Sequence, residues 1–249
     1  MKILGKGTGT EMKVRIKFAK SGAMRFIGHL DIMRYFQKAI RRADIDVAYS
    51  EGFSPHQIMS FASPLGVGLT SNGEYLDIEV KTHAGAEDMK QRLNKVMVEG
   101  MEILSVTMLK EDAKNAMASV AAAEYTVRFR QGYEPGFDWP DRLMEFYHSP
   151  SIIVAKKTKK SEMTLDLKPF IYHLSLLGKG GTAPAVRMLV NASSSGNVKP
   201  GLVMEAFLRA NGEELSPFAL EIIREDTYTD VGKEGEPHFV PLDAIGMEF

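Results

Sequence analysis

The chain has 249 residues, enough for two domains of about 100 residues that each bury a core. Its 44% hydrophobic and 25% charged residues are typical of a globular protein, and its formal net charge of −1 excludes an overall positive field toward nucleic acid. Because it has no cysteine, it cannot form a disulfide, a thiolate zinc site, a cysteine nucleophile or a cysteine-held iron–sulfur cluster.

The N-terminal segment gives no sign of export. Residues 1–11 are rich in Gly, Lys and Thr without periodicity, and we predict a flexible extension there. No run approaches the roughly 18 apolar residues of a membrane span, and no apolar core precedes a small-residue cleavage site. We therefore expect a cytoplasmic protein without a membrane partner.

Residues 12–116 are predicted to form a first unit. Lys13 to Lys20 alternates basic and apolar residues, which predicts a half-buried strand whose outer face is basic. Apolar residues at helical spacing from His29 to Ala43 predict an amphipathic helix. Its opposite side carries the basic residues Arg34, Lys38, Arg41 and Arg42. Further strands are predicted at 46–49, 57–62, 74–80 and 103–109, and a second helix near 89–97.

Residues 117–229 are predicted to repeat that pattern, after a boundary in the alanine-rich segment 111–123. The order βαββαβ, found twice, predicts an α+β fold of two tandem ferredoxin-like units, each an antiparallel sheet with two helices on one face. Residues 230–249 are predicted to be a loosely attached C-terminal tail. In the second unit we predict helices that begin near Pro140 and Pro200, and strands at 125–130, 152–155, 169–177, 185–190 and 220–224.

The junction between the first predicted strand and helix contains the first candidate site residues. His29 falls in the first helical turn, where the helix dipole disfavours imidazolium and leaves a neutral ring to act as an acceptor or base. The N–H groups of a helix start also attract anions, and Arg25 lies nearby. The alternative is structural: Asp31 stabilises the helix start, and His29 packs against it or caps it.

A second candidate lies in the loop before the predicted strand 57–62. Ser54 and His56 stand at one end of that strand, and on the predicted fold they converge with His29 at one end of the sheet. Prolines stand on both sides of this strand, and proline is tolerated in a sheet only at the start of a strand or on an edge strand. Turn residues alone also explain this composition, so ordinary loop chemistry is the alternative.

A third candidate is Lys179, in the glycine-rich loop 178–184. Glycines let a backbone approach a phosphate closely, but this loop lacks the full P-loop spacing and precedes a strand. An ordinary hairpin loop is the alternative, and nucleotide hydrolysis is not expected. The six histidines show no ligand spacing, so no metal site is predicted.

Three strings of residues carry a family resemblance: RFIGHLDIMR at 25–34, YSEGFSPH at 49–56 and GEYLD at 73–77. In their order and separation they resemble the uncharacterised radical-SAM-linked protein family, whose members are encoded beside, or fused to the end of, a radical SAM protein. The resemblance runs from about Met12 to about Tyr228. It implies a radical SAM partner that brings the iron–sulfur cluster and S-adenosylmethionine, while this chain binds no cofactor itself.

The sequence discloses no reaction, and three functions follow from these observations. The first is an accessory, non-catalytic module that presents a substrate, expected to be RNA or a ribosome-related component, to the radical SAM protein. The second is a stand-alone, metal-independent RNA-processing enzyme that uses His29 with Arg25. The third is a structural or regulatory adaptor. The predicted substrate-binding residues are Arg25, His29, Asp31, Arg34, Ser54, His56 and Lys179.

Overall fold

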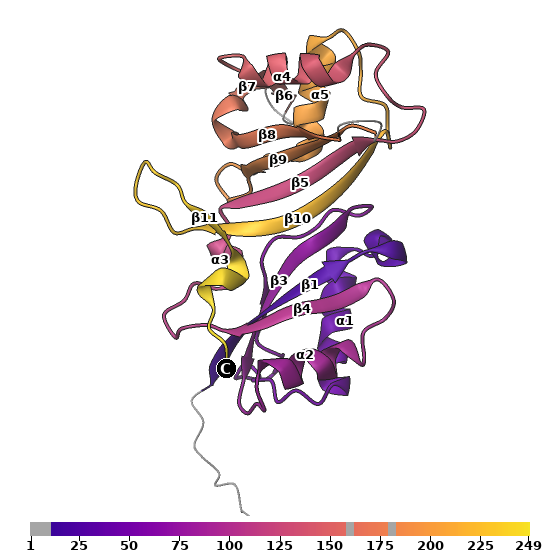
Figure 1. Cartoon of the computed structure of the whole chain (residues 1–249). Helices are drawn as coiled ribbons and strands as arrows, with labels where there is room; N and C mark the ends of the chain where they lie inside the picture. Colours follow the sequence, from indigo (N-terminus) through magenta and orange to yellow (C-terminus); the bar gives the residue numbers. More distant parts are fainter. Residues whose placement is uncertain (1–10, 158–161, 179–182) are drawn as a thin grey trace, which may run out of the picture. The chain divides into compact units, whose positions relative to one another are not determined.

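A computed structural model describes residues 11–157, 162–178 and 183–249 (Figure 1). These residues form an α+β fold with antiparallel sheets, divided into two compact units. Unit 1 comprises the described residues up to Val120 together with Thr227–Phe249, and unit 2 is Ala121–Asp226. The residues of strand β10 (Leu220–Asp230) are divided between the two units. No helix in the described ranges is both long and apolar enough to cross a membrane.

Unit 1 is built on strands in the order β4-β1-β3, with the short β2 paired to β3, and these neighbours run antiparallel. The segment 46–49, predicted as a strand, contributes only single bridges at Val47 and Tyr49. In chain order the elements are β1 (Met12–Lys20), η1 (Gly22–Phe26), α1 (His29–Arg42), β2 (Met59–Phe61), β3 (Thr70–Val80), α2 (Ala86–Asn94), β4 (Met101–Met108), α3 (Ala116–Ser119), β11 (Phe239–Pro241) and η3 (Leu242–Ile245).

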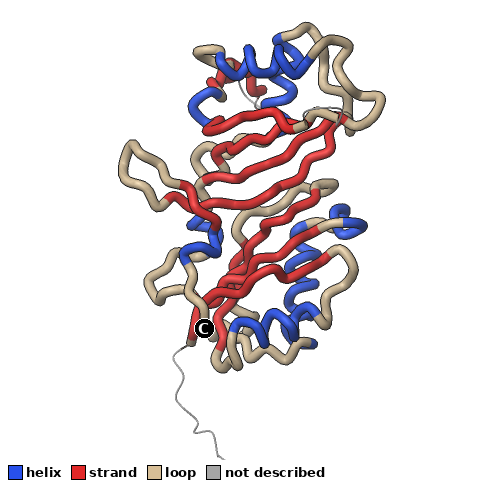
Figure 2. Tube along the Cα trace, in the orientation of Figure 1, coloured by secondary structure: helices blue, strands red, loops and turns tan. Residues whose placement is uncertain are grey.

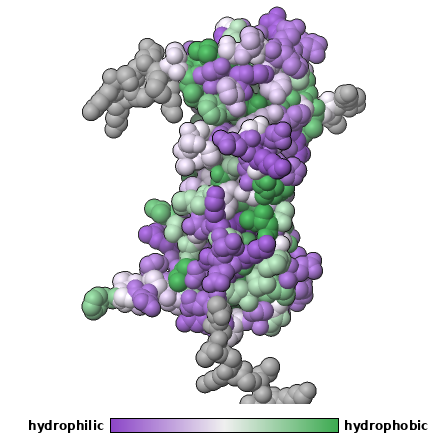
Figure 3. Space-filling model, turned by 90° about the vertical axis from the view of Figure 1, so that its left-hand side faces the viewer, coloured by the Kyte–Doolittle hydropathy of each residue, from purple (hydrophilic) through white to green (hydrophobic). Residues whose placement is uncertain are grey.

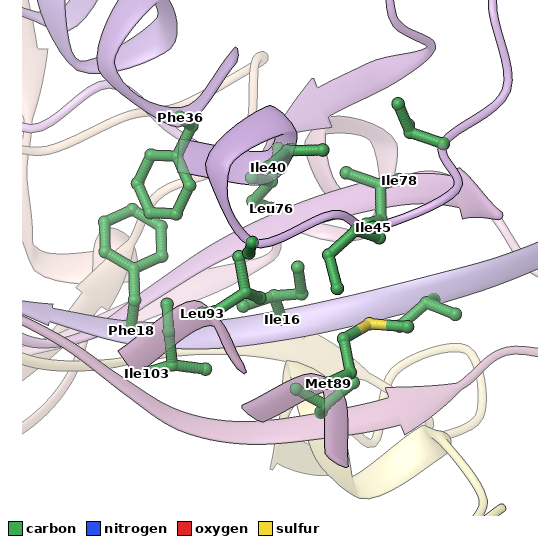
Figure 4. Close-up of a cluster of buried hydrophobic side chains, with 14 of the residues drawn as sticks. Ile16, Phe18, Phe36, Ile40, Ile45, Leu76, Ile78, Met89, Leu93 and Ile103 are labelled. Carbon is green, nitrogen blue, oxygen red and sulfur yellow. The ribbon is translucent and has the colours of Figure 1, made fainter. Parts of the chain in front are cut away.

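The core of unit 1 lies between this sheet and the helices α1 and α2, which cover one of its faces (Figures 2 and 4). Val14, Ile16 and Phe18 alternate along β1 and are buried, as the two-residue period of a strand requires. Phe18 meets Phe36 of α1 with ring centroids 4.7 Å apart. Such an aromatic pair adds about 0.5–1.5 kcal/mol to the burial of its side chains. This contact holds α1 over β1.

The opposite face of the unit 1 sheet is covered by α3 and by the C-terminal residues. Leu242 of η3 is fully buried with Tyr75 of β3 and Ala116 of α3. The sequence predicts a loosely attached tail over 230–249; residues 230–238 are exposed, but the prediction does not describe residues 239–249. Residues 239–249 pack against the sheet because Leu242 gives them an apolar anchor.

The basic outer face predicted for β1 also needs correction at Arg15. Its side chain is fully buried, and it donates to both carboxylate oxygens of Asp77 on β3 at 2.8 Å. It donates in addition to the carbonyl oxygens of Leu242 at 3.0 Å and Lys114 at 3.2 Å. A charge removed from water requires such partners, so Arg15 is a structural residue and not a solvent-facing cation.

Unit 2 has a main sheet with the strand order β10-β5-β9-β8 and a separate two-stranded sheet, β6-β7. The unit begins after Val120, whereas the sequence predicts its start at residue 117. The sequence predicts one strand at 152–155, near β6, and does not predict β7. The elements are β5 (Ala122–Phe129), α4 (Trp139–His148), β6 (Ile153–Lys157), β7 (Glu162–Asp166), η2 (Lys168–Phe170), β8 (Ile171–Leu177), β9 (Ala185–Asn191), α5 (Pro200–Ala210) and β10.

Surface polarity is uneven on the face shown in Figure 3, where hydrophilic side chains predominate and hydrophobic ones gather in smaller patches. Single exposed apolar residues are common on proteins and require no explanation. A group of large exposed apolar side chains requires an explanation, because such groups mark interaction sites. Unit 1 carries a group of this kind beside the start of α1, where the candidate site residues of the sequence also lie.

Candidate functional site

Helix α1 begins at His29, as the sequence predicts, and its start is defined by Gly28. The Gly28 backbone is extended (φ −72°, ψ 161°), and its carbonyl oxygen accepts from the N–H groups of Asp31 at 3.1 Å and Ile32 at 3.0 Å. The His29 ring meets Phe61 of β2 edge-on, with centroids 5.4 Å apart. The start of the helix is therefore packed against β2, and the His29 ring is held between the two elements.

His29 lines a small pocket together with Lys20, Glu74 and Ser63. Its volume is about 20 Å³, which accommodates one water-sized group. Lys20, at the end of β1, is 2% exposed and donates to the carbonyl oxygen of Ile27 at 2.8 Å. Glu74 of β3 is 7% exposed. The apolar walls are Phe18, Ile32, Phe61 and Leu65.

The His29 pocket shifts the protonation of the imidazole. Burial lowers the pKa of His29 below its ordinary value of 6.5; Glu74 opposes this shift, and Lys20 adds to it. The sequence attributes a neutral ring to the helix dipole, whereas removal from water is the main cause in the structure. A neutral imidazole next to a carboxylate and an ammonium has the chemistry of a proton acceptor.

Three large apolar side chains stand in solvent around the start of α1, and we call them the apolar patch: Phe26, Leu30 and Val67. Each is more than 60% exposed. The N–H group of Gly68 donates to the carbonyl oxygen of Arg25 at 2.8 Å, which brings Val67 next to η1. The Arg25 guanidinium lies over the Phe26 ring, 4.8 Å from its centroid. The patch thus combines apolar surface with a cation.

The exposed side of α1 continues from this patch as a basic face, formed by Arg34, Lys38, Arg41 and Arg42. Asp31 and Arg34 form an ion pair at 3.1 Å, with side chains 65% and 70% exposed. A pair this exposed contributes about 0–1 kcal/mol to stability, so Arg34 can exchange Asp31 for an external anion at small cost. We call these four residues the basic α1 face.

The loop with Ser54 and His56 lies beside the middle of α1. Gln57 donates from its side-chain amide to the carbonyl oxygen of Gln37 at 3.3 Å, which ties the end of this loop to the helix. The Nδ1 atom of His56 lies 2.8 Å from the Ser50 hydroxyl oxygen. The structure therefore places His56 against Ser50, whereas His29 faces Lys20 and Glu74. The convergence of His56 and Ser54 with His29 at one end of the sheet therefore stays a prediction.

Phe53, in the same loop, is fully exposed and was not singled out by the sequence, nor were Phe26 and Leu30. The available signal was an aromatic residue within a run of turn-forming residues, where no strand or helix period requires one. Lys179 lies outside the described residues. Among the described residues, no group of three or more His, Asp or Glu side chains gathers in a metal-binding arrangement.

Comparison with known proteins gives a family but no activity. Residues 13–200 match a family model described as an uncharacterised protein conserved in bacteria (DUF2344). No curated protein matches the chain. Among solved structures, a chain in the crystal structure of a Cbf5-Nop10-Gar1 complex aligns with a TM-score of 0.45 and 12% identity. The alignment covers 86% of this chain and 48% of that chain, so this chain spans about half the length of its structural relative.

Proposed function

Because the chain belongs to DUF2344, an uncharacterised bacterial family, we propose a function from its surface chemistry: an accessory module that binds RNA and presents it to a radical SAM protein. The single observation that carries the RNA part is the apolar patch beside the basic α1 face. An exposed aromatic ring beside basic side chains suits single-stranded RNA, whose bases stack on rings while its phosphates meet cations.

Binding through this surface is local and electrostatic. The whole chain has a formal net charge of −1, so phosphates are attracted by the basic α1 face and not by the molecule as a whole. Base stacking on an exposed ring contributes about 1–3 kcal/mol per base and tolerates any sequence. Phe26 and Phe53 provide such rings, and Arg34 provides a cation that only a weak surface pair holds.

The partner in this proposal follows from the resemblance of residues 25–34, 49–56 and 73–77 to the radical-SAM-linked proteins. A radical SAM reaction requires an iron–sulfur cluster, and this chain has no cysteine to ligate one. The partner therefore supplies the cluster and S-adenosylmethionine, and this chain supplies substrate binding.

For the fold, we propose that both units are variants of the ferredoxin-like βαββαβ fold. In unit 1 the first to fourth strands are β1, β2, β3 and β4, and in unit 2 they are β5, β8, β9 and β10, with the β6-β7 hairpin inserted. In both, the strands lie in the order fourth, first, third, second. This order supports the proposal.

Fluorescence anisotropy with a labelled single-stranded RNA oligomer tests the RNA-binding role. We expect Phe26→Ala and Phe53→Ala each to weaken binding by about 1–3 kcal/mol if a base stacks on that ring. Phe218→Ala is the matched control, because Phe218 is an 86% exposed ring in unit 2, away from the apolar patch and the basic α1 face in the chain. Equal affinities for all three variants and the wild type would remove the proposal.

Affinity capture with crosslinking tests the partner. We expect a radical SAM protein from the same genome to be recovered with this chain, together with RNA crosslinked near the apolar patch. Recovery of the protein without RNA would identify the chain as an adaptor. Recovery of RNA without the protein would retain RNA binding and remove the radical SAM partner.

One observation favours a second function, metal-independent RNA cleavage: the lowered pKa of His29 keeps a proton-accepting imidazole beside Lys20 and Glu74. The decisive experiment incubates RNA with the wild type, His29→Ala and Arg25→Ala in the presence of a chelator. Cleavage by the wild type that both substitutions abolish supports an enzyme. Cleavage that is equal in all three samples, or absent from all, excludes it.

A further inference from the structure

Residues 239–249, which we call the C-terminal strap, cross the face of the unit 1 sheet that is opposite to α1 and α2 and end at Phe249, whose carbonyl oxygen accepts from the N–H group of Ala86 at the start of α2 at 3.0 Å. In Figure 1 the strap runs from β11 through η3 to the C-terminus. Its apolar anchor is Leu242, and the backbone groups of Met247 and Met108 exchange two hydrogen bonds of 2.8 and 2.9 Å at the edge of β4. The strap therefore covers a surface that the sheet alone would present.

The carboxylate of Asp243, in the strap, is held by one side chain from each of three strands. Tyr75 of β3 donates its hydroxyl to Oδ1 at 3.1 Å, and Ser105 of β4 donates to Oδ2 at 2.8 Å. The Lys17 ammonium of β1 lies 3.9 Å from Oδ1 and 5.5 Å from the centroid of the Tyr75 ring. Two hydroxyl donors and a cation around one anionic group are partners that a phosphate also takes.

The strap covers one polar group of this sheet face without giving it a hydrogen-bond partner. Gly246 crosses directly over Thr107, where a Cβ atom would lie 2.3 Å from the threonine hydroxyl oxygen. That hydroxyl is buried and has no hydrogen-bond partner among the described residues. A buried polar group without a partner favours the state that uncovers it. The contact between Gly246 and Thr107 is thus a weak point of the strap.

The buried charge beneath the strap keeps most of its hydrogen-bond partners when the strap leaves. Arg15, the most buried charge on this face, keeps both oxygens of Asp77 at 2.8 Å and the Lys114 carbonyl oxygen, and loses only the Leu242 carbonyl oxygen. Removal of the strap therefore leaves no unpaired buried charge at Arg15, which is the large cost in such a rearrangement.

We propose that the face formed by Lys17, Tyr75 and Ser105 is a second binding site for the RNA backbone, in which Asp243 of the strap occupies the phosphate position. The antiparallel sheets of several RNA-binding modules accept single strands on an open face with aromatic residues, and Tyr75 beside Lys17 offers that chemistry. The strap and RNA compete for one surface, so the strap sets the fraction of molecules that can use it. This inference rests on the proposed RNA-binding function.

The substitution Asp243→Asn tests the competition. Asparagine keeps one oxygen acceptor for either the Tyr75 or the Ser105 hydroxyl, places an NH2 group opposite the other hydroxyl and loses the charge that faces Lys17, so the strap is weakened. If the strap leaves the face open in one molecule in ten, complete opening raises the apparent RNA affinity about tenfold. The matched control is Glu248→Gln, which removes one negative charge from an exposed side chain of the same strap. Addition of Lys17→Gln to Asp243→Asn should abolish the gain.

Hydrogen exchange at the Met108 and Met247 amides measures the opening of the strap directly, because each amide donates to the carbonyl oxygen of the other residue. We expect RNA to accelerate exchange at both amides in the wild type. RNA that binds without changing this exchange, and with equal affinity for Asp243→Asn and Glu248→Gln, overturns the strap inference while the α1 surface retains its proposed role. Absence of RNA binding by every variant overturns both.

Discussion

Arg15 and Asp77, 62 positions apart in the chain, form an ion pair with two hydrogen bonds of 2.8 Å in the interior of unit 1. The Arg15 side chain is fully buried and that of Asp77 is 10% exposed. The pair joins the two central strands β1 and β3, and through the Leu242 carbonyl oxygen it also holds the C-terminal strap. One arginine thus connects three segments that are distant in sequence.

Removal of either partner of this pair should destabilise unit 1 strongly. We expect Arg15→Met or Asp77→Leu to lower the free energy of unfolding by about 3–5 kcal/mol, because each leaves an unpaired buried charge. The double substitution should recover most of that loss, since it leaves no charge behind. Denaturant titration of the three variants measures the effect. Arg34→Gln, which breaks the exposed pair with Asp31, is the control and should cost less than about 1 kcal/mol.

Alanine substitutions of Phe36 and Phe53 should have very different effects on the free energy of unfolding. Phe36 is fully buried against Phe18, whereas Phe53 is fully exposed. We expect Phe36→Ala to cost about 3–5 kcal/mol through the cavity that it leaves. Phe53→Ala should change the free energy of unfolding by less than about 0.5 kcal/mol. Similar losses from both substitutions would contradict the packing described for α1.

Acidification should destabilise the protein through His29. Burial holds the pKa of this imidazole below 6.5 in the folded state, so in the window below pH 6.5 the unfolded chain binds the proton more readily. The contribution of His29 to stability is therefore complete above pH 6.5 and is lost as the pH falls through the folded pKa. His29→Gln, which does not titrate, should remove this part of the pH dependence. If the free energy of unfolding of the wild type and of this variant falls in parallel as the pH is lowered from 7.5, His29 does not contribute to the acid destabilisation.

RNA affinity should fall linearly with the logarithm of salt concentration, with a slope set by the cations in contact with phosphates. Each neutralised phosphate of a single strand contributes about 0.7 to the slope. We expect Arg34→Gln and Lys38→Gln each to reduce its magnitude by about that amount. Arg209→Gln in α5 is the control, because Arg209 forms a comparable exposed pair with Glu205 in unit 2. An unchanged slope for Arg34→Gln and Lys38→Gln would show that the basic α1 face is not the contact.

The sequence contains the local part of this structure. The two-residue period of Val14, Ile16 and Phe18 identifies β1, and the helical period after His29 identifies α1 with its correct first residue. Asp31 and Arg34 are exposed on that helix, as its polar side requires. These features depend on neighbours within a few residues, and local periodicity records such neighbours directly.

The candidate site was predictable only in part. Arg25, His29 and Arg34 lie at or near the start of α1, but the partners of His29 are Lys20 and Glu74, which strand pairing brings to the same pocket. His56 is held by Ser50, through a loop conformation that residue types do not specify. The exposure of the Phe26 and Phe53 rings could be seen only in the three-dimensional structure, because apolar residues are expected from sequence to be buried.

What the sequence by itself determined is the set of helices and strands whose apolar residues repeat at the period of the backbone. Only the tertiary structure decided that Arg15 is buried, that residues 239–249 pack on unit 1 and that Asp243 reaches Lys17. The physical reason is that burial of a charge depends on partners from distant segments, here Asp77 and Leu242, and chain closure over such distances leaves no local pattern.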